Sequence, residues 1–285
     1  METALKRERG IVIAALSLVI CASWIYVLNG AGMSMSAFEM SSWSRALGQA
    51  EPGQMSCSPS GAMADAMAAM ATPAVWTAGY AILLFFMWWI MMIAMMLPSA
   101  AAMILLYDVV DRKTKERAGQ PGGPWATAVF ALGYLLAWAA FSAIATTLQW
   151  LFEWLGVLSP MMMNSTNALF SGGILLFAGV YQLTPIKQAC LRHCRGPLEF
   201  LRFHWRPGIG GALGMGIHHG AFCLGCCWGL MAILFFGGIM NLYWMIGLAA
   251  TVLIEKVFSV GSKLSAITGV FFIVWGMSFV YGALA

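Results

Sequence analysis

Long apolar runs separated by short polar segments organise this chain of 285 residues. The longer runs reach the roughly 20 residues that a helix needs to cross a bilayer. No series of segments alternates with a period of two, as membrane β-strands would. The pattern therefore predicts an all-α, polytopic transmembrane helical bundle with about seven spans. The predicted spans are residues 11–28, 79–106, 125–150, 168–183, 209–236, 241–254 and 264–283.

Composition supports a membrane protein, because 61% of the residues are hydrophobic and only 9% are charged, against roughly 25% charged in soluble domains. Membrane lipid is then an expected partner. The net charge of +4 indicates no nucleic-acid partner, since the basic residues lie beside the spans. Seven cysteines, most of them in or next to apolar runs, disfavour a secreted disulfide framework.

Basic residues indicate which side of the membrane each loop faces. With these span limits, all 15 lysines and arginines except Arg45 lie on one side. Loops rich in Lys and Arg stay in the cytoplasm, so the amino terminus is predicted to be cytoplasmic. The spans at 168–183 and 241–254 are short for a full crossing, and tilting, local thinning or partial re-entry would each accommodate them.

The run at 209–236 contains the sequence MGIHHGAFCLGCCW at residues 215–228, with two histidines and three cysteines. On a helix that turns about 100° per residue, the side chains on one stripe are Met215, His219, Cys223 and Cys226, with Cys227 at its edge. His218 points about 100° away from this stripe. Ionisable groups are costly inside a membrane, which makes this cluster a candidate metal site, although buried cysteine also packs as a small apolar residue.

The span at 79–106 carries an array of methionines ahead of Pro98. Two neighbouring rows at helical spacing consist of Met87, Met91 and Met95, and of Met92 and Met96. Thioethers favour Cu(I), whereas methionine also serves as an ordinary packing or lipid-facing residue. If the array lies at the depth of the histidine and cysteine cluster, the two could share an ion.

Two loops carry further candidate ligands. The external loop 30–78 is rich in methionine, which either collects Cu(I) or fills gaps in a helical cap. The cytoplasmic loop after residue 183 holds Cys190, His193 and Cys194, with His204 as a further ligand for a metal site. From residue 198 onward this loop is instead interpreted as a basic amphipathic segment on anionic lipid. A local ion pair is expected between Glu255 and Lys256.

Three stretches carry a resemblance to a known family. They read WWIMMIAMMLPSA at 88–100, YQLTPIKQACLRHCRGP at 181–197 and HHGAFCLGCCWGLMAILFFGGIMNLYWM at 218–245, with Glu255 and Lys256 following. The chain resembles the family called domain of unknown function 2182 over residues 86–284. Its members are described as predicted metal-binding integral membrane proteins, some of them labelled copper chaperones. The resemblance implies metal binding and a multi-span fold, without an established reaction.

These patterns divide the chain into a first span at 1–29, the methionine-rich external loop at 30–78 and a six-span metal-binding membrane domain at 79–285. We expect an integral protein of the bacterial inner (plasma) membrane that handles a soft metal, foremost Cu(I), as a membrane copper chaperone or a transporter. A copper-accepting membrane or periplasmic protein would be its partner. Binding is favoured over catalysis.

Two alternatives remain open at this stage. Cys223 and Cys226 form a C-x-x-C pair that would suit a membrane thiol-disulfide oxidoreductase. The other alternative is a haem bound by His218 or His219, or a role as an accessory subunit of a metal-dependent membrane oxidase. A soft metal other than copper also fits the ligands.

Overall fold

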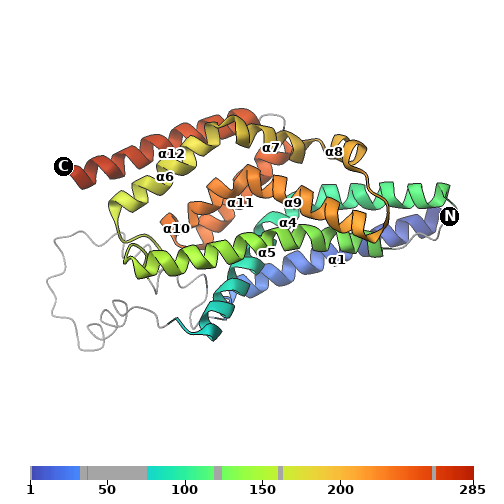
Figure 1. The fold of residues 1–285 in the computed structure, drawn as a ribbon, viewed down its shortest axis with the longest axis horizontal. Helices are drawn as coiled ribbons and strands as arrows, with labels where there is room; N and C mark the ends of the chain where they lie inside the picture. The colour runs from blue at the N-terminus through green and yellow to red at the C-terminus, as the bar shows by residue number, and fades with distance from the viewer. Residues whose placement is uncertain (1, 33–36, 38–75, 119–123, 160–162, 259–260) are drawn as a thin grey trace.

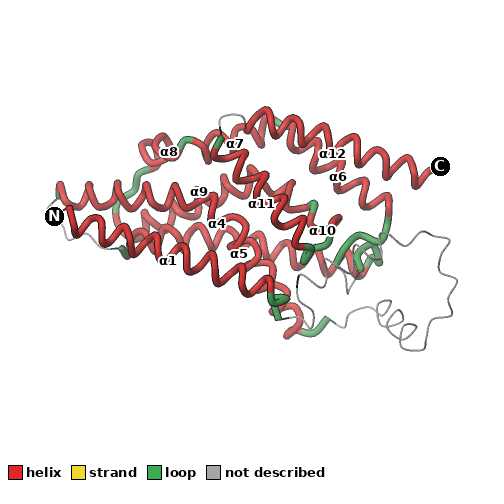
Figure 2. The backbone as a smooth tube through the Cα atoms, turned by 180° about the vertical axis from the view of Figure 1, so that it is seen from behind, coloured by secondary structure: helices red, strands yellow, loops and turns green. Residues whose placement is uncertain are grey.

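The computed structural model describes residues 2–32, 37, 76–118, 124–159, 163–258 and 261–285. The methionines of the predicted external loop, from Met33 to Met70, lie outside these ranges, as does Arg45. Helices account for nearly all of the described chain (Figure 2), and the only strand-like feature in these ranges is an isolated bridge between Leu158 and Ser165. The prediction of an all-α protein is confirmed.

The helices lie side by side in an elongated body (Figure 1). Their bounds are α1 Glu2–Leu28, α4 Ala78–Arg117, α5 Trp125–Trp154, α6 Ala168–Leu183, α7 Pro185–Arg195, α8 Pro197–His204, α9 Gly208–Ala232, α10 Leu234–Gly237, α11 Leu242–Val257 and α12 Gly261–Leu284. The most extensive packing joins α6 with α12, α5 with α9, α4 with α5, and α1 with α4. α7 packs on α9, which matters for the site below.

Several of these helices are long and apolar enough to cross a membrane. Within the described residues, five segments are each long and apolar enough without a neighbouring helix: Gly10–Leu28, Ala78–Arg117, Trp125–Trp154, Gly208–Gly237 and Gly261–Leu284. A sixth arises if α6 and α7, which meet at a bend of 62°, form one broken span. α11 has only 16 residues. The prediction of about seven spans thus includes two elements, α6 and α11, that are shorter than a full crossing.

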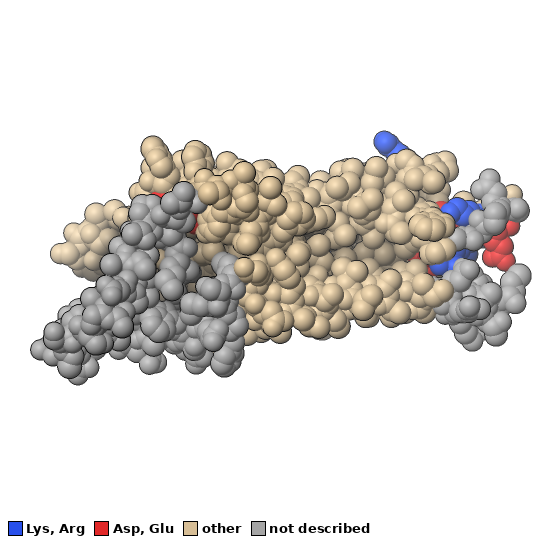
Figure 3. Space-filling view, turned by 90° about the horizontal axis from the view of Figure 1, so that it is seen from below, with Lys and Arg blue, Asp and Glu red and all other residues tan. Residues whose placement is uncertain are grey.

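The two ends of the molecule differ in charge. The amino and carboxyl termini lie at opposite ends of the elongated body (Figure 1), as an odd number of passes would require. On the face shown in Figure 3, basic side chains gather toward the end that holds the amino terminus, and a broad uncharged belt covers the middle. This distribution fits the predicted orientation.

Glycines allow α5 and α9 to approach each other closely. A Cβ atom at Gly216 would overlap the carbonyl oxygen of Phe130 and lie 3.1 Å from the Cα of Gly133. Gly220 of α9 likewise faces Tyr134 and Ala137 of α5. Small residues at four-residue spacing are the usual means of bringing two membrane helices into backbone contact. The contact holds the face of α9 that carries its cysteines against its neighbours.

Replacing Gly216 by alanine is therefore expected to destabilise the bundle by about 1–3 kcal/mol, because the backbone of α5 must move to admit a methyl group. Gly214→Ala is the matched control, since a Cβ there meets no atom within 4 Å, and alanine is the better helix former. Thermal unfolding in detergent, followed by helical circular dichroism, compares the two. Equal stability of the two variants would contradict the packing described for α5 and α9.

The bend between α6 and α7 has a local cause. Thr184 ends α6 and caps α7, where its hydroxyl accepts a hydrogen bond from the amide of Lys187. Pro185 then occupies the first turn of α7. A backbone N–H at that position has no partner within the helix, so proline loses no hydrogen bond there. The residue before a proline is pushed out of the helical conformation, so the helix stops and restarts. The bend directs α7 across α9.

Candidate metal centre

The predicted stripe of α9 faces the interior of the bundle. His219 is 4% exposed and Cys223, Cys226 and Cys227 are at most 1% exposed. Met215 is also buried, whereas His218 is exposed. The separation of His218 from the other ligands follows from the helical turn of about 100° per residue. The arrangement of these six side chains on the helix is therefore as predicted.

All five candidate methionines of α4, Met87, Met91, Met92, Met95 and Met96, are buried inside the bundle. This excludes the interpretation that they face lipid. α4 continues through Pro98 to Arg117.

One of these methionines meets a cysteine of α9. The Sγ atom of Cys227 lies 3.9 Å from the Sδ atom of Met96. Two sulfurs that each lie about 2.3 Å from a tetrahedral metal ion are about 3.8 Å apart, so this separation is compatible with two ligands of one ion as well as with ordinary packing. The contact joins α4 and α9 at the depth where the sequence predicted a shared site.

A second sulfur pair joins α7 to α9. The Sγ atom of Cys194 lies 3.9 Å from that of Cys226. Cys190, one turn earlier on α7, rests on Gly225, where an added Cβ would come within 2.8 Å of its sulfur. The bend at Thr184 is what brings these two cysteines from the predicted cytoplasmic loop onto the same helix as Cys226 and Cys227. The predicted grouping of Cys190 and Cys194 with His193 is not observed, because His193 is exposed and stacks on Phe222 instead.

Cys223 has partners that the sequence did not suggest. The ammonium group of Lys256 donates a hydrogen bond of 2.9 Å to its sulfur and another of 3.0 Å to the hydroxyl of Ser99. The hydroxyl of Tyr134 lies 3.1 Å from the same sulfur and donates to the backbone carbonyl of Met96. A buried positive charge thus stands beside one of the candidate ligands and links α4, α5, α9 and α11.

Lys256 is free for this role because Glu255 pairs with a different lysine. The Nζ atom of Lys187 lies 2.7 Å from a carboxylate oxygen of Glu255, and both side chains are at most 2% exposed. Gln182 also donates to Glu255 and to Thr268. The prediction of a local ion pair between Glu255 and Lys256 is wrong, since neighbouring residues on a helix point in different directions.

His219 lies among aromatic rings. Its ring centroid is 5.6 Å from that of Phe200, 5.9 Å from that of Tyr134 and 6.3 Å from that of Phe130. The buried imidazole is thus enclosed on the side of α5 and α8, one turn before Cys223. The imidazole of His219 lies next to the sulfur pairs. Among the described residues, no hydrogen bond joins it to them.

The sulfurs form pairs and do not enclose a single point. Among the residues that the structure describes, no three histidine, cysteine, aspartate or glutamate side chains are placed to hold one metal ion. The described cysteines are all free thiols, and Cys223 and Cys226 contact different partners.

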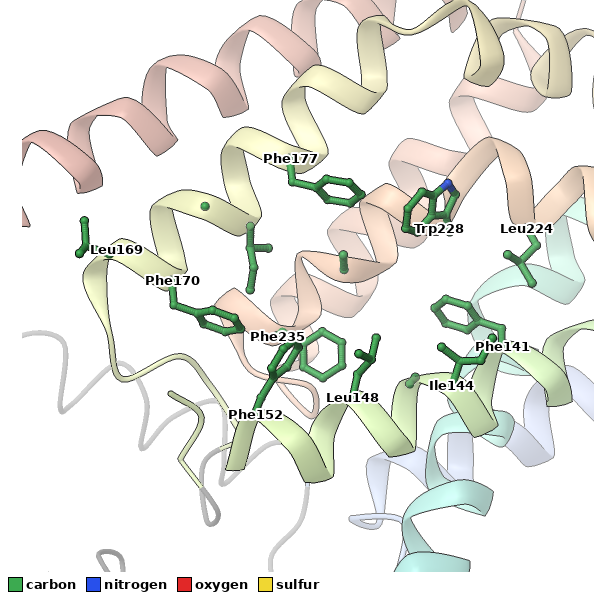
Figure 4. A pocket seen from close by; sticks show the side chains of 14 residues that line it. Phe141, Ile144, Leu148, Phe152, Leu169, Phe170, Phe177, Leu224, Trp228 and Phe235 are labelled. Atoms are coloured by element: carbon green, nitrogen blue, oxygen red, sulfur yellow. The ribbon is translucent and has the colours of Figure 1, made fainter. Parts of the chain in front are cut away.

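A large groove nearby has a different character. Between α5, α6 and α9 lies a cavity of about 680 Å³, whose labelled lining residues in Figure 4 are all apolar. They include Phe152, Phe177 and Trp228. The lining provides no metal ligand, so the groove is separate from the sulfur pairs.

These observations define an all-helical protein with long apolar helices and close pairs of buried sulfur atoms contributed by α4, α7 and α9. The chain belongs to the PpoB2 family, described as copper chaperone, whose sequence model matches residues 85–279. The match covers the methionine array, α7 and the whole of α9, and it supports a copper-related function. The matching family model is not named domain of unknown function 2182, the family that the three sequence stretches resemble, so that name is not confirmed. No curated protein and no solved structure shows significant similarity to the chain.

Proposed function

We propose that this protein is an integral membrane copper-binding protein that receives Cu(I) and passes it to a copper-accepting membrane or periplasmic protein. It would act as a membrane copper chaperone or as a transporter. The observation that carries the proposal is the pair of 3.9 Å sulfur contacts, Cys227 with Met96 and Cys226 with Cys194. Thiolates and thioethers together select Cu(I) over harder ions, and the family description points to the same metal.

In this proposal copper is cargo that moves between ligands of increasing strength. The methionines of α4 would accept the ion first, because thioethers are weaker donors than thiolates or imidazole. Cys226 and Cys227, supported by His219 and Cys223, would hold it more tightly. Cys190 and Cys194, on α7, would bind copper at the cytoplasmic end of the path, and a periplasmic acceptor would take copper at the external end. The methionine-rich segment 30–78 would supply the external entrance.

The proposal also includes a place in the cell. About seven passes, with α6 and α11 as the short ones, would put the amino terminus in the cytoplasm and the carboxyl terminus outside. The opposite placement of the two termini and the basic side chains near the amino-terminal end support this orientation (Figures 1 and 3). The membrane would be the inner (plasma) membrane of a bacterium.

Elemental analysis tests the central statement directly. Protein purified in detergent under reducing conditions, from cells grown with copper, is expected to contain about one or more equivalents of copper. Anaerobic titration with Cu(I) against a chelator of known affinity then gives stoichiometry and dissociation constant. Copper at background level, together with no competition for Cu(I), would refute the proposed function.

Met96→Leu gives a sharper test of the ligand set. Leucine has nearly the volume of methionine, so the expected loss of stability is below about 1.5 kcal/mol. Removing the thioether that contacts Cys227 is expected to weaken Cu(I) binding about tenfold, equivalent to about 1.4 kcal/mol. Met103→Leu is the matched control, because Met103 is also buried on α4 but lies outside the methionine array. The proposal predicts that titration separates the two variants, and equal affinities would exclude Met96 as a ligand.

A double-mutant cycle then asks whether Met96 and Cys227 hold the same ion. If they do, the effects of Met96→Leu and Cys227→Ser on Cu(I) affinity will not add, since either change already breaks the shared coordination. Additive effects would place the two sulfurs on different ions.

A further inference from the structure

Three of the four histidines in the chain gather where α7, α8 and α9 meet. The ring of His193 stacks on Phe222, with centroids 4.2 Å apart and planes within 7°. His218 contacts the same phenylalanine at 4.8 Å. His204 approaches His218, with ring centroids 4.7 Å apart. Two imidazoles, from α7 and α9, thus contact one phenylalanine, and a third, from α8, contacts His218.

Backbone contacts define how two of these rings are protonated. The Nδ1 atom of His193 lies 3.0 Å from the carbonyl oxygen of Ala189, and that of His204 lies 3.2 Å from the carbonyl oxygen of Phe200. A carbonyl oxygen only accepts, so each Nδ1 donates the hydrogen bond, and in the neutral ring the lone pair is then on Nε2. Metal-binding histidines almost always donate their second nitrogen in this way. Both rings are therefore prepared to bind a cation through Nε2.

The cluster is accessible from outside the bundle. His193 and His218 are exposed and His204 is half-buried. A cleft of about 190 Å³ is lined by His193, His204 and the carboxylate-bearing Glu199. Arg192 lines the same cleft, and its positive charge offsets the negative charge of Glu199. The imidazole nitrogens are therefore the principal metal ligands there.

Phe200 separates this cluster from the buried sulfur pairs. It is 2% exposed, and its ring lies 4.9 Å from His204 on one side and 5.6 Å from the buried His219 on the other. The surface imidazoles and the interior sulfurs are thus chemically and spatially distinct. Imidazole suits Cu(II), Ni(II) and Zn(II), whereas thioether and thiolate suit Cu(I).

From this geometry we infer a second metal site, in which His193, His204 and His218 bind a divalent ion of borderline softness at the surface of α7, α8 and α9. Among the described residues, the three rings are not arranged around one point. The ion draws His193 and His218 inward, since exposed side chains change rotamer within nanoseconds. This inference does not depend on Cu(I) transfer through the interior.

Calorimetric titration of the full-length reduced protein in detergent with Ni(II) tests the site, because Ni(II) is not reduced by thiols. The wild-type protein is expected to bind about one equivalent, and His204→Gln/His218→Gln is expected to bind at least about tenfold more weakly. His193→Gln, which alters one exposed ring only, provides a second variant in which folding is not at risk. Arg202→Gln is the control on α8, since it changes charge without removing an imidazole, and it is expected to leave Ni(II) affinity unchanged.

A thiol variant separates this site from the proposed copper route. Cys226→Ser/Cys227→Ser is expected to keep Ni(II) binding, because Phe200 stands between the two regions. Loss of Ni(II) binding in that variant, or wild-type affinity in both histidine variants, would overturn the inference. A wild-type protein that binds Ni(II) but no Cu(I) would refute the proposed function and leave the histidine site standing.

Discussion

Replacing Cys223, Cys226 and Cys227 together by serine is expected to abolish Cu(I) binding in the interior of the protein. The change removes one sulfur from each of the two close pairs, with Met96 and with Cys194. A hydroxyl group is a hard, weak donor for Cu(I), so neither remaining partner can hold the ion as part of a pair. Competition titration with a Cu(I) chelator is expected to show the loss of at least one equivalent.

The control for this variant is Cys21→Ser. Cys21 is an exposed cysteine on α1, away from the sulfur pairs, so its replacement is expected to leave both stoichiometry and affinity unchanged. Circular dichroism and gel filtration establish that the triple variant is folded, since serine at Cys223 can still accept the hydrogen bond from Lys256. Unchanged copper stoichiometry in a folded triple variant would remove α9 from the copper route.

Glu255→Ala is expected to cost about 3–5 kcal/mol of stability, because it leaves the ammonium group of Lys187 buried without its counter-ion. The same ion pair ties α11 to α7, and Gln182 and Thr268 extend it to α6 and α12. Its loss is also expected to displace Lys256, the next residue, from the sulfur of Cys223. Thermal or denaturant unfolding in detergent measures the first effect.

Asp111→Ala serves as the comparison for an ordinary ion pair. Asp111 pairs with Lys115 one helical turn away at 2.6 Å, but the lysine is 26% exposed. Partly exposed pairs of this kind contribute up to about 1 kcal/mol. The double variant Lys187→Met/Glu255→Met is expected to recover much of the lost stability, since no charge then remains buried. If Glu255→Ala were no less stable than Asp111→Ala, the buried pair would have no structural role.

The helical face of α9 could be predicted from the sequence because it depends only on the turn of one helix. His219, Cys223 and Cys226 share a stripe, and His218 leaves it, wherever that helix lies in the fold. To predict that Met96 is buried opposite Cys227 requires one more assumption, namely that two apolar spans cross at similar depth. The structure places these two residues in contact.

Contacts between distant segments could not be predicted in the same way. Cys194 reaches Cys226 only because the chain bends at Thr184 and Pro185. The bend had a sequence signal, a capping threonine followed by proline, but its direction depends on packing against α9. Lys256 reaches Cys223 for a similar reason, and its partner could be found only once α11 was placed.

The error at Glu255 has a simpler physical origin. Adjacent residues on a helix point about 100° apart, so Glu255 and Lys256 cannot face each other. Helical geometry alone would have assigned them separate partners. The same rule separates His193 from the adjacent Cys194, since their side chains point about 100° apart.

The two sulfur pairs join residues 32 and 131 positions apart in the chain. Neither pair exists until α4, α7 and α9 have assembled, so an unfolded chain offers copper the neighbouring cysteines of residues 223–227 without Met96 or Cys194 beside them. Binding that is specific to the folded state stabilises that state, by about 2.7 kcal/mol when free ligand is 100-fold above its dissociation constant. The metal supply of the cell would therefore help to set how much of this protein persists in its assembled form.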